Sequence, residues 1–257
     1  MSPAKKDFLS IVIPAYREQR TIERTIFELK KVLNKHHLNY EIICVVDGIV
    51  DKTYALAKKH ASKNVRVLAY QINRGKGYAV QYGLSKARGN IIGFIDANGI
   101  DPDSVPMLLQ HFYWYKADIV VGSKKHPVSQ VVYPWRRRVI SWIYQKIIRT
   151  LFSLQITDTQ VGLKLFRAPI MHRILPRLLV KEFAFDIEIL AVAYYLGYQR
   201  LYEAPVRLKL STKKNLSTVF SKGFFRSSFL MFKDTLAVFY RLRIRHYYDK
   251  KTKLKRI

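Results

Sequence analysis

Short apolar runs rich in β-branched residues alternate with longer segments of helical periodicity through the first half of the chain. The predicted strands span 8–14, 40–46, 65–70, 90–95 and 118–121. The predicted helices span 18–35, 51–60, 77–87 and 102–115. The strands are apolar on both faces, which is typical of a parallel sheet covered by helices. This alternation predicts a doubly wound α/β fold.

The second half of the chain is less regular, and no linker separates it from the first half. Its predicted elements are a helix at 135–154, a polar loop entering a strand at 158–166, a helix at 185–196 and a strand around 203–206. A chain of 257 residues has room for one sizeable core. We therefore expect one domain at 1–210, followed by a basic amphipathic, membrane-associating extension at 211–257.

The charge balance is unusually basic, with 46 Lys and Arg residues against 18 Asp and Glu residues and a formal net charge of +28. Such a field attracts nucleic acid, anionic lipid or phosphorylated substrates, and charge alone does not choose among them. Cys44 is the only cysteine and lies in an apolar run, so we expect it to be buried in a protein of a reducing compartment. No apolar segment approaches the roughly 20 residues of a membrane span, which predicts a soluble or peripheral protein.

Aromatic and basic residues recur at near-helical spacing in the C-terminal region. The apolar members are Phe220, Phe224, Phe225, Phe229, Phe232, Leu236 and Phe239. A basic amphipathic helix with aromatic residues is typical of the lipid interface. The same stripe could instead pack on the core of this protein, and the pattern leaves both readings open.

Polar residues follow each of the first four predicted strands. They are Pro14-Ala15-Tyr16, Asp47-Gly48, the basic turn at 73–77 and Asp96. Doubly wound sheets bind ligands in the crevice beyond the carboxyl ends of their strands. The convergence of several polar strand ends therefore predicts a binding site at this edge.

Each polar segment has a binding interpretation and a structural one. Asp96 could face a divalent cation that neutralises a diphosphate, or it could cap the next turn. Asp47 could accept hydrogen bonds from a nucleobase or ribose, and Asp51 could either contact the ligand or cap the helix that follows. The turn that contains Lys76 could meet a phosphate with its backbone amides and its lysine.

Seven motifs in order along the chain resemble glycosyltransferase family 2. They are Ile13 to Glu18, Val46 to Thr53, Asn73 to Gly77, Asp96 to Asn98, Gly122 to Lys124, Asp158 to Lys164 and Phe185 to Glu188. Within that family the sequence is most similar to the dolichyl-phosphate mannose and glucose synthase branch. The Asp-Thr-Gln and Phe-Asp-x-Glu motifs favour a polyprenyl-phosphate acceptor.

The resemblance implies a GT-A fold, a mostly parallel Rossmann-like sheet flanked by helices, with a C-terminal amphipathic helical extension. It further implies a nucleotide-diphosphate sugar donor, Mg²⁺ or Mn²⁺, and inverting transfer of mannose or glucose to a polyprenyl or dolichyl phosphate. The expected setting is an anionic membrane surface on the cytoplasmic face, without nucleic acid as a partner.

The motifs assign roles to individual positions. The expected nucleotide-binding residues are Pro14, Tyr16, Glu18, Asp47 and Lys76. The expected catalytic residues are Asp96, Asp158 and Gln160, and the expected metal ligands are Asp96 and Asn98. The expected acceptor or phosphate-binding residues are Lys124, Arg137, Lys213 and Lys214.

The sequence departs from the family pattern at three positions. Val46 stands where the family usually has the first of two aspartates, Ile49 replaces a serine, and Asn98 replaces the second acid of an Asp-x-Asp motif. Asparagine offers a cation a carbonyl oxygen without charge, so Asp101 or Asp103 could supply the missing carboxylate, or the chain could be inactive.

Two functions from other classes compete with the enzyme: a basic α/β protein that binds nucleic acid, and a catalytically silent membrane scaffold. The basic residues form no helix-turn-helix, zinc-finger or RNA-recognition signature. Carboxylates at successive strand ends would also repel a phosphate backbone. The motifs therefore favour the transferase over both alternatives.

Overall fold

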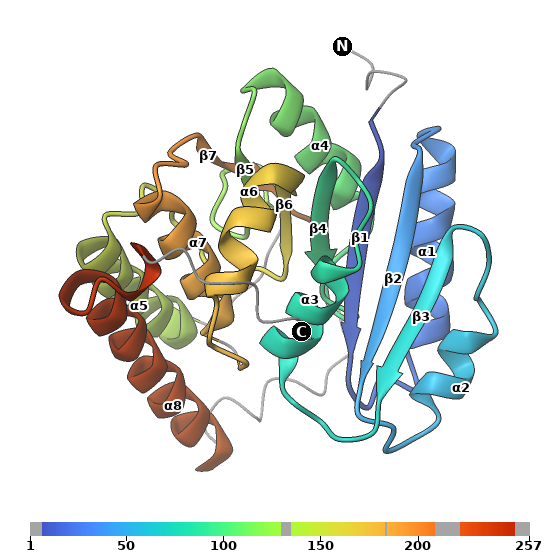
Figure 1. Cartoon of the computed structure of the whole chain (residues 1–257), viewed down its shortest axis with the longest axis horizontal. Helices are drawn as coiled ribbons and strands as arrows, with labels where there is room; N and C mark the ends of the chain where they lie inside the picture. The colour runs from blue at the N-terminus through green and yellow to red at the C-terminus, as the bar shows by residue number, and fades with distance from the viewer. Residues whose placement is uncertain (1–6, 130–134, 183, 209–221, 250–257) are drawn as a thin grey trace.

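The computed structural model describes residues 7–129, 135–182, 184–208 and 222–249. These residues form one seven-stranded sheet in the order β3-β2-β1-β4-β6-β5-β7, with helices on both faces (Figure 1). The strands are β1 (Leu9–Ala15), β2 (Tyr40–Asp47), β3 (Val65–Tyr70), β4 (Ile91–Ile95), β5 (Ile119–Ser123), β6 (Leu163–Arg167) and β7 (Leu201–Pro205). The predicted α/β alternation is confirmed.

The α-helices are α1 (Ile22–Lys35), α2 (Thr53–Lys58), α3 (Lys76–Ser85), α4 (Ser104–Trp114), α5 (Trp135–Phe152), α6 (Ala168–Ile174), α7 (Phe185–Tyr195) and α8 (Lys222–Phe239). A five-residue π-helix, η3 (Tyr240–Ile244), continues α8. The sequence did not predict α6, because seven residues are too few to show a helical period. The remaining helices lie where the periodicity placed them, and several are shorter at their ends.

Strand direction sets where ligands can bind. β1 pairs in parallel with β2 and β4, and β2 pairs in parallel with β3. β6 runs antiparallel to both β4 and β5, while β5 and β7 are parallel. The carboxyl ends of β1 to β4 therefore open on one edge of the sheet, as the sequence predicted.

Each face of the sheet carries its own apolar core, since side chains alternate along every strand. Along β1, Val12 faces the core under α3, α5, α6 and α7, whereas Ile11 and Ile13 face the core under α1 and α4. Cys44 is fully buried in the second core, as predicted. Burial raises the pKa of its thiol to about 12.

The described part of the C-terminal region packs on the first core and also exposes an apolar face. Val238, Leu242 and Tyr248 are buried there, and the Phe239 ring lies 6.2 Å from that of Phe152 on α5. The exposed side chains along α8 and η3 are Leu230, Phe232, Leu236, Tyr240 and Ile244. Of the predicted stripe, Phe239 therefore packs on the core, whereas Phe232 and Leu236 are exposed; binding of the stripe at a lipid interface stays a prediction.

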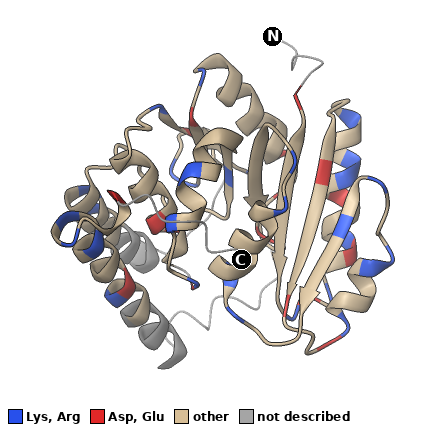
Figure 2. Cartoon of the chain, in the orientation of Figure 1, with Lys and Arg blue, Asp and Glu red and all other residues tan. Residues whose placement is uncertain are grey.

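Other members of the stripe cannot be placed on either face. Phe220 lies outside the described residues, as do the side chains of Phe224, Phe225 and Phe229. The division at residue 210 stays a prediction. Among the described helices, none combines the length and apolar character needed to cross a bilayer. Lys and Arg residues are spread over several elements, α1 and the C-terminal helix included (Figure 2).

Candidate active site

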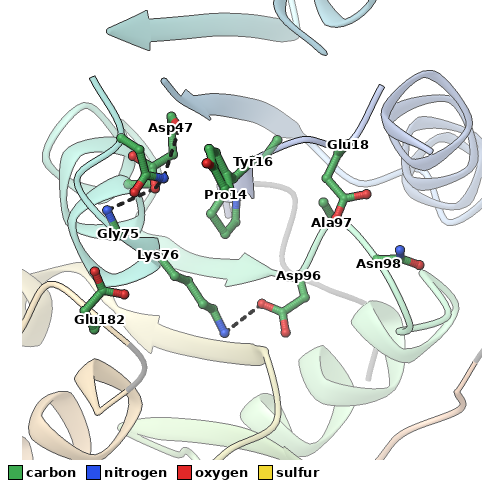
Figure 3. Close-up of a pocket in the computed structure, with 13 residues that line it drawn as sticks. Pro14, Tyr16, Glu18, Asp47, Gly75, Lys76, Asp96, Ala97, Asn98 and Glu182 are labelled. Carbon is green, nitrogen blue, oxygen red and sulfur yellow. Dashed lines mark hydrogen bonds and ion pairs between the residues drawn. The ribbon is translucent and has the colours of Figure 1, made fainter. Parts of the chain in front are cut away.

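A pocket of about 460 Å³ lies at the carboxyl ends of β1, β2 and β4, beside the first turn of α3 (Figure 3). Its volume is in the range of sites for small molecules. The lining residues are Pro14, Ala15, Tyr16, Glu18, Asp47, Asn73, Gly75, Lys76, Ala79, Asp96, Ala97, Asn98 and Glu182. The structure thus brings together every residue predicted for nucleotide or metal binding.

Asp47, buried at the end of β2, organises the turn that precedes α3. Its carboxylate accepts hydrogen bonds from the backbone N–H groups of Arg74 (2.7 Å) and Gly75 (3.1 Å). The Tyr70 hydroxyl (2.9 Å) and the Asn73 side-chain amide (2.8 Å) donate to the same carboxylate. Direct contact between Asp47 and a nucleobase stays a prediction. What the structure shows is that Asp47 fixes the turn carrying Lys76.

Both the backbone conformation and the close neighbours at position 75 require a glycine. Its φ of +94° lies in the left-handed region, which favours glycine. A side chain there would also meet the Lys181 carbonyl oxygen, 2.5 Å from an added Cβ. The turn is therefore held between the end of β2 and the segment that precedes α7.

Four charged residues form a charge cluster at the floor of the pocket: Lys76, Asp96, Asp186 and Lys164. The Lys76 ammonium lies 2.8 Å from Asp96 Oδ1 and 3.2 Å from Asp186 Oδ2. The fully buried Lys164 ammonium contacts the other Asp186 oxygen and donates to the Val161 carbonyl at 2.7 Å. Burial acts to lower the pKa of Lys76, but the charges of Asp186 and Asp96 outweigh it and raise that pKa.

Glu18 lines the pocket, and Asp51 lies close enough to act on its charge. Burial raises the pKa of Glu18, although a hydrogen bond from the Thr21 hydroxyl opposes the shift. Asp51 Oδ1 accepts the Thr53 backbone N–H at 2.9 Å, at the start of α2. That contact matches the capping interpretation of Asp51, which does not line the pocket.

Glu182 is a pocket residue that the sequence analysis missed. It lies in the segment before α7, over one hundred positions along the chain from Asp47 and Asn73, so no local pattern signals it. Burial raises its pKa, and the charge of Asp47 adds to that effect. Its carboxyl group lies on the wall of the pocket near Gly75 (Figure 3), and the raised pKa favours its protonated form more than in a free glutamate.

A second group of predicted residues lies at the ends of β5 and β7. The Asp158 carboxylate, 7% exposed, accepts the backbone N–H groups of Lys124 (3.1 Å) and Gln160 (3.2 Å). Among the described residues, the buried Gln160 Nε2 has no hydrogen-bond partner. The group adjoins the pocket through Gly162, whose carbonyl accepts the Asp96 N–H at 2.7 Å.

Glu203 on β7 positions this second group, and the sequence analysis did not assign it a role. Its carboxylate accepts the backbone N–H groups of Thr157 (3.0 Å) and Asp158 (2.9 Å), and the Thr157 hydroxyl as well. The contacts join positions more than 40 residues apart, which explains why spacing gave no signal.

Replacing Glu203 with Ala is expected to lower the free energy of unfolding by about 1–3 kcal/mol, because two backbone N–H groups lose their acceptor. Urea denaturation measures the change. Tyr202→Phe is the matched control on the same strand and should change stability by less than about 0.5 kcal/mol. Equal stability of both variants would show that Glu203 does not hold the 157–158 turn.

The phosphate-binding roles of all four predicted residues stay predictions, and the side chains of three of them are not described. Lys213 and Lys214 lie outside the described residues, and Arg137 lies on α5 with its side chain likewise undescribed. The described residues contain no group of three or more His, Cys, Asp or Glu placed to hold a metal. A cation held by Asp96 and Asn98 therefore stays a prediction, and it would need water and substrate phosphates to complete its coordination.

The sheet, with acids and a lysine gathered at its carboxyl edge, places the chain in the class of doubly wound α/β proteins, which bind ligands at this edge. Residues 10–175 match the family described as Glycosyl transferase family 2, and the chain belongs to that family.

Sequence relatives carry names consistent with the expected branch. The chain is 33% identical over 212 residues to the dolichyl-phosphate beta-glucosyltransferase of Dictyostelium discoideum, covering 76% of this chain and 65% of the relative. It is 30% identical to the human protein of that name, covering 76% and 64%. A dodecaprenyl-phosphate galacturonate synthase from Rhizobium johnstonii is 26% identical, covering 68% and 54%. The chain thus spans less than two thirds of the length of these relatives.

Solved structures confirm the GT-A fold. Mannosyl-3-phosphoglycerate synthase from Rubrobacter xylanophilus superposes with a TM-score of 0.70 at 16% identity, covering 96% of this chain and 77% of that one. Glucosyl-3-phosphoglycerate synthase from Mycobacterium tuberculosis, solved with Mn²⁺, UDP-glucose and phosphoglyceric acid, gives 0.65 at 17% identity, covering 96% and 82%. At these identities the likeness establishes the fold alone.

Proposed function

We propose that this chain transfers a hexose from a nucleotide-diphosphate sugar to a polyprenyl or dolichyl phosphate. The pocket supports this proposal most directly, because it gathers Lys76, Asp96 and Asn98 at the edge where such sheets bind nucleotides. The names of the relatives favour glucose as the sugar. Mannose is the alternative within the same branch.

The donor would lie across the pocket. Pro14, Tyr16 and Glu18 would contact the nucleoside, and the turn fixed by Asp47 would present its backbone and Lys76 to the diphosphate. A Mg²⁺ or Mn²⁺ ion held by Asp96 and Asn98 would supply positive charge to the leaving diphosphate when bound. The carboxylate of Glu182 adds an acceptor for a hydroxyl or N–H group of the donor.

The acceptor chemistry follows from its charge. A phosphate monoester has a second pKa near 6, so it is largely dianionic at neutral pH and is already a nucleophile. The protein must then bring two anions together and align them for in-line displacement, which inverts the anomeric carbon. We assign the acceptor phosphate to Lys124, Arg137, Lys213 and Lys214. Asp158 and Gln160 would orient the reacting groups.

The exposed apolar face of α8 and η3 supports a membrane setting for this reaction. Phe232, Leu236, Tyr240 and Ile244 lie four residues apart and are 37–60% exposed. Lys233 and Arg243 are exposed beside them. Apolar side chains flanked by basic ones suit the interface of an anionic leaflet. We place the protein at the cytoplasmic face, as a peripheral protein.

Substituting Leu236, Tyr240 and Ile244 together with Ser is expected to weaken binding to vesicles containing phosphatidylserine by about tenfold or more, because apolar area leaves the interface. Vesicle sedimentation measures the affinity. The matched control is a double Ser variant of Trp114 and Tyr115, which are exposed on and after α4. Equal losses of vesicle affinity in both variants would show that α8 does not form the proposed membrane interface.

The proposed function is tested by incubating the protein with UDP-glucose or GDP-mannose and a short polyprenyl phosphate, with and without Mg²⁺ or Mn²⁺. Product mass identifies the sugar, and the anomeric configuration tests inversion. We expect one donor to give a hexosyl polyprenyl phosphate. Nucleotide binding without product would favour a silent relative, and a salt-sensitive gel shift without nucleotide-sugar binding would favour a nucleic-acid-binding protein.

A further inference from the structure

Asp47 has no acceptor position left for a ligand. Its Oδ1 accepts hydrogen bonds from the Tyr70 hydroxyl at 2.9 Å and the Arg74 backbone N–H at 2.7 Å. Its Oδ2 accepts the Asn73 side-chain amide at 2.8 Å and the Gly75 backbone N–H at 3.1 Å. An ionised carboxylate offers about four acceptor positions, so all of them are filled. Because Asp47 is also only 2% exposed, a nucleobase could reach it only by disrupting the turn before α3.

Glu182 differs from the other acids of the pocket lining, because its carboxyl group is accessible and unpaired. The residue is exposed, and within the described part of the chain no group donates a hydrogen bond to its carboxyl or forms an ion pair with it. Glu18 instead accepts the Thr21 hydroxyl, and Asp96 is paired with the Lys76 ammonium. Glu182 therefore retains its capacity to accept hydrogen bonds from a bound molecule.

The backbone fixes the place of the Glu182 carboxyl on the pocket wall. The Lys181 carbonyl accepts the Tyr78 N–H of α3 at 3.2 Å, and the Glu182 carbonyl accepts the Phe185 N–H of α7 at 3.1 Å. A Cβ added at Gly75 would lie 2.6 Å from Glu182 Oε1, so the carboxyl lies directly beside the turn before α3. A group held in this way by two helices is positioned before a ligand binds.

The lining residues divide between two sides of the pocket. Asp96 and Asn98 lie toward one side, and Gly75 and Glu182 lie toward the other (Figure 3). We assigned the first side to the diphosphate, and an ionised acid on the second side would repel a phosphate. Burial and neighbouring acids raise the pKa of the Glu182 carboxyl, so a bound N–H group would stabilise its ionised form. The second side therefore suits the part of a sugar nucleotide that carries N–H groups, which is the nucleobase.

We infer that Glu182 selects the nucleobase, by accepting the ring N–H that lies beside a carbonyl in uracil (N3–H) and in guanine (N1–H). Asp47 then supports the turn without reading the base. Cytosine and adenine carry no such ring N–H, so the contact disfavours both. This inference rests on the proposed function and deepens it, because it assigns the contact that recognises the base of the sugar nucleotide.

Calorimetry with a methylated nucleotide tests the contact without reference to turnover. The nucleotide pair is UDP and 3-methyl-UDP, or GDP and 1-methyl-GDP, whichever parent binds wild type more tightly, with Mg²⁺ present throughout. Methylation removes the ring N–H and should weaken binding to wild type by about tenfold or more. Glu182→Ala should bind the parent about tenfold more weakly and should distinguish the pair by less than about threefold. Glu182→Gln keeps a carbonyl acceptor and should retain part of the discrimination.

Glu23→Ala is the matched control, because it changes the net charge equally on an exposed part of α1 outside the pocket. It should match wild type with both nucleotides. Undiminished discrimination in Glu182→Ala, or no discrimination in wild type, would overturn the inference and leave the proposed function standing. Discrimination lost in Asp47→Asn but kept in Glu182→Ala would assign the base to Asp47. A wild type that binds neither UDP nor GDP would overturn both the inference and the proposed function.

Discussion

Asp96→Asn is expected to lower kcat/KM for hexose transfer by about a hundredfold or more, with little change in fold stability. The Asp96 carboxylate contacts Lys76, as Asp186 does, and the Asp96 backbone N–H is hydrogen-bonded to Gly162 at the end of the 158–162 loop. Removing its charge deprives the proposed diphosphate site of a fixed anionic partner for Lys76 and for a cation. Asparagine has nearly the same shape as aspartate, so the loss of activity would result from the missing charge and not from altered packing.

The matched control for Asp96 is Asp103→Asn, at the start of α4. The sequence left open whether Asp101 or Asp103 compensates for Asn98, and neither lines the pocket. The Asp101 carboxylate instead accepts the Asp103 backbone N–H at 3.1 Å. We therefore expect Asp103→Asn to retain activity within about threefold of wild type. A large loss of activity in Asp103→Asn, together with near-normal turnover of Asp96→Asn, would show that the proposed metal-binding carboxylate lies in the turn before α4 and not at Asp96.

Glu188→Ala is expected to lower the free energy of unfolding by about 3–5 kcal/mol, the second large effect. The Glu188 carboxylate on α7 is fully buried and accepts the backbone N–H groups of Leu179 (3.0 Å) and Val180 (2.8 Å). The Tyr248 hydroxyl donates to it at 2.7 Å from the C-terminal segment. Truncation leaves these buried donors without an acceptor, and urea or thermal unfolding measures the cost.

Tyr248→Phe separates the contributions at Glu188. It removes one donor and keeps the two backbone contacts, so a loss of about 1–2 kcal/mol is expected. The segment held by Glu188 continues to Lys181 and Glu182, which both lie against Gly75, and Glu182 also lines the pocket. Glu188→Ala should therefore also weaken binding of the donor. If the variant is less stable but binds the donor with unchanged affinity, Glu188 stabilises the fold without supporting the pocket.

The Phe-Asp-x-Glu motif thus has a physical explanation in this fold. Its aspartate, Asp186, joins the charge cluster, and its glutamate, Glu188, ties the pocket wall to the C-terminal segment. The sequence pointed to the motif through a family resemblance, but not to these partners. Lys76 and Asp186 are 110 positions apart, and no periodicity or spacing reports a contact over that separation.

What the sequence did predict was local. Apolar β-branched runs identify the strands, and polar residues directly after them identify the binding edge of the sheet. The pocket residues between Pro14 and Asn98 could therefore be predicted. Glu182 and Glu203 act through contacts between distant segments and became visible only in the structure. The short helix α6 was missed because its length carries no periodic signal.

The central claim is that the edge formed by β1, β2 and β4 holds a nucleotide sugar, and hydrogen–deuterium exchange tests it most directly. Adding UDP-glucose or GDP-mannose should slow amide exchange in peptides covering 14–18, 73–77 and 96–98, and leave the β7 edge of the sheet unchanged. Unaltered exchange in all three peptides with both donors, or protection confined to the β7 edge, would contradict the account.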